Sequence, residues 1–387
     1  MHVLLAAAAT AAAAAAAAVR APPGDVVITP GVPWYTVDGA RVYAGGGSIV
    51  FDRGRYWFVG EGNKTLPPTT GGDCSECFNL YSSPDLGSWT FEGCVLRNED
   101  LRAAMPAPQF QNVTAYPFFR MERPKIFKCP GNGRWTMWFH CDTDSFAISS
   151  VGVLTADAVT GPYTFASPCF KPDGYGSYDQ GVFFDDPAVH PLGDGKMYHV
   201  RSVDNSYAGI SQMTDDCLNV TGIISGGTPK MEAQALMRDS KGTLHLAGSH
   251  ESGWGPNGAI FLTSPNTSLV GAVWGNSYNP SASGSTWDSQ STFLLPYRHA
   301  DGHITHVWMA DRWNMWGPGS IQVSRVGPHH SHCYPPPPPR ESHTLCKMCA
   351  PLPVGNQHAR CTTDSATTSP RPPPPPPRTL RRSGCRS

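Results

Sequence analysis

Short runs of alternating apolar and polar residues, separated by glycine turns, make up most of the chain. One pattern occurs five times: a glycine turn, then an alternating stretch rich in aromatic residues, then a polar or acidic residue. The five copies are residues 54–61, 133–142, 195–204, 242–251 and 302–311. Alternation with a period of two is typical of β-strands. No long stretch carries a helical apolar period, so we predict an all-β protein.

A short apolar strand is expected just before each copy. These strands are predicted at residues 48–51, 125–128, 187–190, 234–237 and 291–296. In the fourth copy, the polar turn Asp239–Gly242 joins the two strands as a hairpin. Most copies are followed by another strand and an Asp- or Asn-containing turn, as in Leu80–Trp89. Repeated units of four strands indicate propeller blades. Five copies predict a five-bladed β-propeller, since a β-sandwich would not need the same aromatic strand five times.

The composition changes at both ends of the chain. Residues 3–19 are apolar and Ala-rich, which predicts that residues 1–21 are a signal peptide or a short anchor. After about Val326, proline runs at residues 335–339 and 372–377 replace the strand pattern, so residues 329–387 are interpreted as an extended or disordered Pro/Cys-rich tail. A zinc site can be drawn around Cys346 and Cys349, but the spacing fits no closed finger, and disulfides or free thiols are favoured.

At 387 residues the chain is long enough for one large or two ordinary domains, and the five copies predict one propeller domain at residues 22–328. The 29 Lys+Arg residues balance 30 Asp+Glu residues, which argues against nucleic acid as a partner. Twelve cysteines and four glycosylation sequons, at Asn63, Asn112, Asn219 and Asn266, indicate a secreted or lumenal glycoprotein with disulfides. A monomer without a firm membrane partner is expected, and no residue pattern requires a cofactor or a catalytic metal.

Polar residues beside the repeated strands are the candidates for chemistry, because the innermost strands of a propeller converge on a central channel. Glu122, Asp179, Glu232 and Gln290 each precede the aromatic strand of their own copy, and Glu61 ends the first one. Glu232 lies among Met, Ala and Leu, so it either points to solvent or sits in a site that raises its pKa. Most Asp and Glu residues are solvated surface groups, but four polar residues in phase make that reading less favourable here.

Convergent carboxylates with aromatic platforms indicate glycoside hydrolysis. One protonated acid delivers a proton to the leaving oxygen, and a second polar group handles water on the opposite face of the sugar. A Ser-His-Asp hydrolase is disfavoured, because no Gly-x-Ser-x-Gly turn precedes a helix.

A set of short motifs lies in a fixed order between about residues 30 and 318. They are Glu122-Arg-Pro-Lys125, Ser177–Gly181 with Asp185-Asp186, Met231-Glu-Ala, Gly253–Asn257, Ser289–Thr292 and Asp311-Arg-Trp313. As a set they resemble glycoside hydrolase family 43, and in particular its exo-β-1,3-galactanase (galactan 1,3-β-galactosidase) subgroup. The resemblance implies a five-bladed propeller and an inverting, exo-acting enzyme that releases galactose from β-1,3-galactan of the arabinogalactan type.

The resemblance also implies a role for each matching residue. Glu232 would be the general acid, Asp179 would orient the sugar and tune the pKa of the acid, and Glu122 would bind galactose hydroxyls. Gln290 stands at the water-activating position in place of the usual Asp base, although a neutral amide is a poor base. Weaker candidates for substrate contacts are Glu61, Trp254, Asn257, Ser252, Asn205 and Phe146.

Several positions depart from the subgroup pattern. Ala44 precedes the first glycine triplet where a His is usual, Phe146 replaces a sugar-contacting Tyr, and Gln234 replaces a Pro. The expected last aromatic strand is replaced by Ile321–Val326, which raises the alternative of an incompletely closed fifth blade. Two other functions stay open: a galactan-binding propeller without turnover, and a family 43 arabinofuranosidase or xylosidase, against which the Gln290 motif argues.

Overall fold

The computed structural model describes residues 31–62, 76–105, 118–253, 257–281 and 284–312 in full, and only the backbone of residues 19–20 and 321–326. All of them belong to one compact unit, Met1–Met348, and the second unit, Cys349–Ser387, lies outside the described residues. The predicted tail, residues 329–387, and nearly all of the predicted leader also lie outside them.

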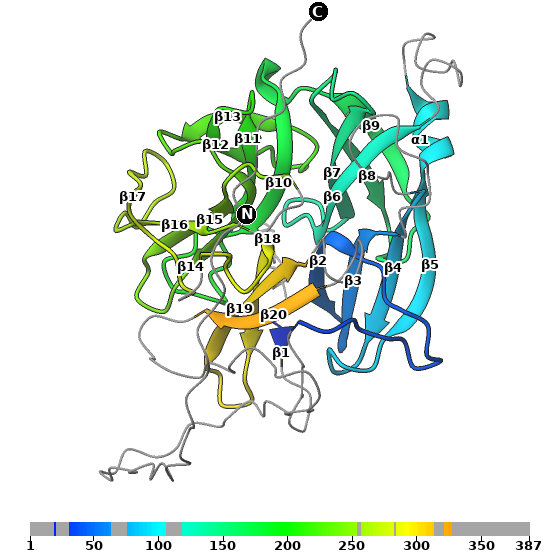
Figure 1. Ribbon diagram of the computed structural model, residues 1–387, viewed down its shortest axis with the longest axis horizontal. Helices are drawn as coiled ribbons and strands as arrows, with labels where there is room; N and C mark the ends of the chain where they lie inside the picture. The colour runs from blue at the N-terminus through cyan, green and yellow to red at the C-terminus, as the bar shows by residue number, and fades with distance from the viewer. Residues whose placement is uncertain are drawn as a thin grey trace, which may run out of the picture. The chain divides into compact units, whose positions relative to one another are not determined.

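Four sheets of four antiparallel strands follow one another along the chain (Figure 1). The first contains β2 (Gly45–Asp52), β3 (Arg55–Glu61), β4 (Cys77–Ser83) and β5 (Thr90–Arg97). The second contains β6 (Phe119–Lys128), β7 (Trp135–Thr143), β8 (Ser150–Ala156) and β9 (Thr164–Phe170). The third contains β10 (Ser177–Phe184), β11 (Met197–Val203), β12 (Tyr207–Met213) and β13 (Val220–Ser225). The fourth contains β14 (Glu232–Arg238), β15 (Leu244–Ser249), β16 (Ala259–Ser264) and β17 (Gly275–Tyr278).

The last sheet is built differently. It contains β18 (Gln290–Arg298), β19 (Ile304–Asp311) and β20 (Ile321–Val326), which pair antiparallel in that order. Its fourth member is β1 (Val19–Arg20), which pairs parallel with β18 at the opposite edge. The predicted all-β propeller arrangement is confirmed, and four blades of four antiparallel strands are complete among the described residues.

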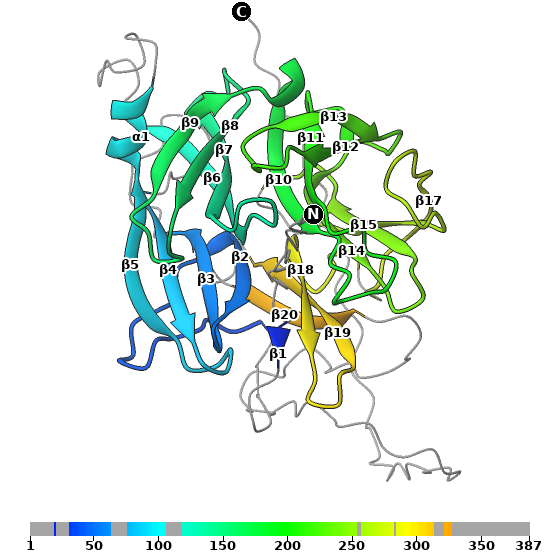
Figure 2. The same ribbon diagram turned by 180° about the vertical axis from the view of Figure 1, so that it is seen from behind.

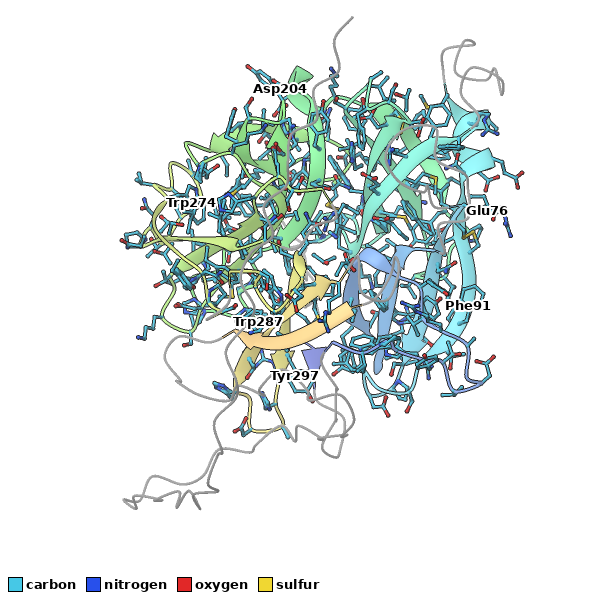
Figure 3. All side chains as sticks on the ribbon, in the orientation of Figure 1. Glu76, Phe91, Asp204, Trp274, Trp287 and Tyr297 are labelled. Atoms are coloured by element: carbon cyan, nitrogen blue, oxygen red, sulfur yellow. A yellow bond between two sulfur atoms is a disulfide. The ribbon has the colours of Figure 1, made fainter. Side chains whose placement is uncertain are left out.

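The first strand of each sheet lies nearest the middle of the ring. Contacts join β2 to β6, β6 to β10, β10 to β14, β14 to β18 and β18 back to β2. Figure 2, the view from behind, shows these strands surrounding one central region. Figure 3 shows Glu76 and Phe91 on the outer side of the first sheet, away from β2. The five innermost strands are therefore neighbours around one central region.

The aromatic strands form the core between the sheets. Those predicted from the glycine turns are the second strands of the sheets, β3, β7, β11, β15 and β19. Their buried side chains contribute to five hydrophobic clusters, each at the boundary of two neighbouring sheets. Members from the two sides of the five boundaries are Phe78 with Phe139, Trp138 with Met213, Tyr198 with Leu246, Phe261 with Trp308, and Phe58 with Met309. The last cluster joins the first sheet to the fifth and closes the ring.

One predicted strand is absent. Residues 187–190 form a turn, and the first strand of the third sheet is instead β10, which begins at Ser177. The turn forms because Asp186 accepts hydrogen bonds from the chain that follows it. Its carboxylate accepts from the N–H of Ala188 at 2.8 Å, and its carbonyl accepts from the N–H of Val189 at 2.9 Å. Such local bonds compete with a β-ladder.

The part of the chain that the structure describes also contains two short helices and three disulfides. Helix α1 (Asn98–Ala104) leads from β5 toward β6, and the 3₁₀-helix η2 (Pro172–Gly174) precedes β10. The bonds Cys77–Cys94 and Cys141–Cys169 lie within single sheets, whereas Cys129–Cys217 joins the second sheet to the third. Within the described ranges, no helix has the length and apolar character needed to cross a membrane.

Candidate active site

Each innermost strand bends near its start. The register of pairing shifts after Gly45 in β2, Glu122 in β6, Tyr178 in β10, Glu232 in β14 and Ser291 in β18. Such bulges add a residue and re-aim the side chains beside them. Four bulge residues have positive φ angles: Gly46 at 63°, Arg123 at 55°, Asp179 at 29° and Ala233 at 58°. Strained backbone of the kind seen at the three non-glycine residues collects at functional sites, and here it lies near the start of the innermost strands.

Arg123 brings three of the predicted residues together at this end. Its Nε donates to Oδ1 of Asp179 at 3.1 Å, and its Nη2 donates to Oε1 of Gln290 at 2.6 Å. The Nε2 of Gln290 donates to Oε1 of Glu232 at 2.8 Å and to Oγ of Ser249 at 3.0 Å. Asp179, Glu232 and Gln290 thus come from three sheets to a common region around Arg123.

Glu232 lies in surroundings that favour its neutral form. Burial is the largest cause, the negative charge of Asp179 adds to it, and the positive charge of Arg123 opposes it. Together they raise the pKa of Glu232 to about 8. Of the two possibilities left open by the sequence, the second fits: Glu232 is a half-buried carboxyl group in a site that raises its pKa.

Glu122 lies next to two cationic side chains. Its Oε1 is 3.6 Å from Nη1 of Arg120, and its Oε2 is 3.1 Å from Nδ1 of His140. Nε2 of His140 lies 3.3 Å from Oδ2 of Asp142. Burial alone would lower the pKa of His140, but the hydrogen bonds and charges of Asp142 and Glu122 raise it to about 10. The imidazolium and guanidinium groups hold the Glu122 carboxylate in a fixed place.

The ligand atoms of Glu122, His140 and Asp179 all lie within 4.8 Å of one another. These are donor types that divalent cations accept. Two of the three already face a guanidinium group, Glu122 that of Arg120 and Asp179 that of Arg123. Arg120 and Arg123 therefore supply positive charge next to these two carboxylates.

The weaker candidates are spread more widely. Glu61 is buried, and its Oε1 accepts from the backbone N–H of Arg123 at 3.0 Å. The ring of Phe146 is 39% exposed and lies 4.2 Å from Cζ of Arg120, stacked on His140 with 6.1 Å between centroids. Both border the cluster around Arg123 and Glu122.

The four other candidates lie outside that cluster or outside the described residues. Asn257 donates to Oγ of Ser252 at 2.6 Å, in the loop between β15 and β16. Asn205 is exposed in the turn between β11 and β12, with φ of 52°. Trp254 is outside the described residues.

Sequence reasoning missed several polar residues that take part. Arg123 and Lys125 lie inside a recognised motif, but no role was predicted for them. The ammonium group of Lys125 donates to the carbonyl of Gly47 at 2.8 Å, and burial, aided by Arg123, lowers its pKa to about 7. Burial likewise raises the pKa of Asp311 to about 6. His140 was signalled only by its position in the aromatic strand, where it alternates with Asp142.

Solved structures similar to this protein include carbohydrate-active enzymes. An exo-β-1,3-galactanase from Phanerochaete chrysosporium, solved with β-1,3-galactotriose, is 27% identical with a TM-score of 0.64, over 78% of this chain and 64% of that one. An exo-β-1,3-galactanase from Clostridium thermocellum is 25% identical with a TM-score of 0.63, over 78% and 62% of the two chains. A family 43 β-1,3-galactosidase solved with galactodeoxynojirimycin is 26% identical with a TM-score of 0.62, over 77% and 94%.

This chain thus spans less than two thirds of the length of both galactanases, and most of the length of the β-1,3-galactosidase. No protein-family model matches the chain, and no curated protein matches it in sequence. The similarity to these structures confirms the predicted resemblance to the exo-β-1,3-galactanases of glycoside hydrolase family 43.

Proposed function

We propose that this protein, which resembles the family 43 exo-β-1,3-galactanases in fold and motifs, is an inverting glycoside hydrolase that releases galactose from β-1,3-galactan. The observation that carries the proposal is the environment of Glu232. A carboxyl group with a pKa raised to about 8 lies within hydrogen-bond distance of the amide of Gln290 and under the influence of the Asp179 charge. A carboxyl group that keeps its proton near neutral pH is the general acid that glycoside hydrolysis requires.

Each residue has a physical task in this reaction. Glu232 donates its proton to the glycosidic oxygen as the C–O bond breaks, so the sugar leaves without an unstable alkoxide. Asp179 keeps that proton in place through its negative charge and accepts a sugar hydroxyl. Gln290 is assigned to orienting the attacking water, whose proton passes to solvent as the new C–O bond forms. Glu122, held by Arg120 and His140, accepts hydrogen bonds from galactose hydroxyls.

The substrate is proposed to be the polysaccharide β-1,3-galactan, including arabinogalactan side chains. Phe146 and Glu61 border the acid cluster and are proposed substrate contacts, together with Trp254, Asn257, Ser252 and Asn205. We assign no cofactor to the reaction. These contacts would decide which sugar and which branches the site accepts.

The remaining assignments concern the whole chain. We propose five blades, with β18–β20 as the fifth, in a domain of residues 22–328 between a leader of residues 1–21 and a tail of residues 329–387. The three disulfides favour secretion or a secretory lumen, where such bonds persist. Asn219 is exposed, as a glycosylation site must be. A monomer is proposed.

One observation favours a second function, a galactan-binding propeller without turnover. The exposed ring of Phe146 offers an apolar platform but no hydroxyl group for a sugar. Such a site can retain sugar binding while the transition state loses a hydrogen bond.

Product analysis on β-1,3-galactan tests the proposal. The full chain, expressed by a secretory route, should release free galactose with the α anomer first. Glu232→Gln should reduce the rate about 10²–10⁴-fold, the usual contribution of a positioned proton donor. Glu99→Gln, an exposed residue of α1, is the control and should keep the wild-type rate. Binding of the polymer without product would favour the second function, and an unchanged rate in Glu232→Gln would reject the assigned acid.

A further inference from the structure

Arg123 touches three other sheets from its place in the second one. Its backbone N–H donates to Glu61 in the first sheet, and its Nε donates to Asp179 in the third. Its Nη1 donates to the carbonyl of Ser291 at 2.8 Å, and its Nη2 to the amide oxygen of Gln290, both in the fifth. The residue is only 4% exposed and has a φ of 55°, which side chains other than glycine rarely adopt. A strained, buried arginine held in this way indicates a task that other residues cannot perform.

The contact with Gln290 determines which way its amide faces. An amide has an accepting oxygen and a donating nitrogen, whereas a guanidinium group only donates. The oxygen of Gln290 must therefore face Arg123, and its NH₂ group must face Glu232 and Ser249. Because the NH₂ group donates to Oε1 of Glu232, the proton of the neutral acid belongs on Oε2, the other oxygen.

We infer that Arg123 is a positioning residue: it fixes the orientation of the Gln290 amide and the position of the Asp179 carboxylate relative to the acid, Glu232. The inference rests on the proposed function and deepens it. Through this contact the amide directs the acid's proton to one oxygen, and the same guanidinium group keeps Asp179 beside the acid. Arg123 itself acts through these residues.

Lysine cannot replace this arginine without loss. The guanidinium group presents its donors in a rigid planar fork, whereas an ammonium group is a single point on a flexible stem. Three separate atoms of Arg123 reach Asp179, Gln290 and Ser291. Arg123→Lys therefore keeps the positive charge but loses the fork, and Arg123→Met loses both.

The pH dependence of activity distinguishes this role from a merely structural one, because the charge of Arg123 affects the pKa of Glu232. The positive charge of Arg123 lowers the pKa of Glu232 against the effects of burial and Asp179. Removing the charge should raise the pKa of the acid further. Since a general acid works only when protonated, activity should then persist to a higher pH.

The test compares wild type, Arg123→Lys and Arg123→Met by steady-state kinetics on β-1,3-galactan across a range of pH. Both variants should lose about 10²-fold in kcat, the usual cost of a small misplacement of reacting groups, with KM less affected. The alkaline limb of kcat/KM should move to higher pH in Arg123→Met and stay in place in Arg123→Lys. Wild-type kcat in Arg123→Lys would overturn the inference.

A double-mutant cycle gives an answer even if Arg123→Met does not fold. In a Gln290→Ala background, Arg123→Lys should cost much less than it does alone, because residues that act through one another are not additive. Additive losses would show that Arg123 does not act through Gln290 and would reject only the inference. A wild-type protein that releases no galactose would reject the proposed function and the inference with it.

Discussion

The proton on Glu232 depends on the charges next to it. Asp179 raises the pKa of this acid and Arg123 lowers it, while burial makes the largest contribution. The two neighbours thus oppose each other, and with both in place the pKa is about 8. The wild-type pH profile should therefore lose activity on the alkaline side at about pH 8, as the acid ionises.

Asp179→Asn should move that alkaline limb to lower pH. Removing the negative charge of Asp179 lowers the pKa of Glu232, so the acid loses its proton earlier as pH rises. Kinetics of galactose release measured across pH would show the shift, opposite in direction to that of Arg123→Met. Asp157→Asn is the matched control, since Asp157 is exposed and forms an ion pair at 3.1 Å with Arg134, which is also exposed. A limb that stays in place in Asp179→Asn would contradict the electrostatic account.

At the scale of elements, the first sheet depends on the close approach of β2 and β3. A Cβ atom added to Gly60 would lie 2.2 Å from the backbone carbonyl of Ala44, and one added to Gly47 would lie 1.9 Å from the carbonyl oxygen of Val59. Backbone atoms cannot swing aside as a flexible side chain can. Glu61 follows Gly60 directly, so this approach also places the carboxylate that accepts from Arg123.

Gly60→Ala should destabilise the protein by at least about 1–3 kcal/mol, the usual cost of forcing extra atoms into a packed region. Chemical denaturation of the variant would measure the loss. Gly275→Ala is the control: Gly275 is exposed in β17, no atom lies within 4 Å of an added Cβ, and its stability should stay within about 0.5 kcal/mol of wild type. Equal stabilities of the two variants would show that β2 and β3 can separate without cost.

At the scale of the whole molecule, packing closes the ring and one disulfide links two blades. Cys129 and Cys217 are 88 residues apart and connect the second sheet to the third, whereas Cys77 and Cys94 are 17 residues apart within the first. Closing a longer loop restricts the unfolded chain more. The bond between sheets should therefore contribute more to stability.

Replacing both Cys129 and Cys217 with Ser should lower the free energy of unfolding by about 4–5 kcal/mol, against about 3 kcal/mol for the pair Cys77 and Cys94. Denaturant titration of the two double variants would compare them. A larger loss from the shorter loop would mean that local packing, rather than chain entropy, sets the contribution of these bonds.

Sequence alone was sufficient for the features that depend on neighbouring residues. The glycine turns and alternating aromatic residues predicted β3, β7, β11, β15 and β19, because strand pattern and turn chemistry are local. Local pattern failed at residues 187–190, where the Asp186 side chain makes a turn that an apolar run does not reveal. It also could not show that the two-residue strand β1 pairs parallel with β18.

The sequence by itself determined that polar residues precede the aromatic strands in phase, which marked Glu122, Asp179, Glu232 and Gln290 as one set. Only the tertiary structure decided how they meet. The partners of Arg123 lie 56 to 168 residues away along the chain, so its role is invisible until the sheets close into a ring. The raised pKa of Glu232 also cannot be read from the sequence, because it depends on burial and on charges that only folding brings next to this residue.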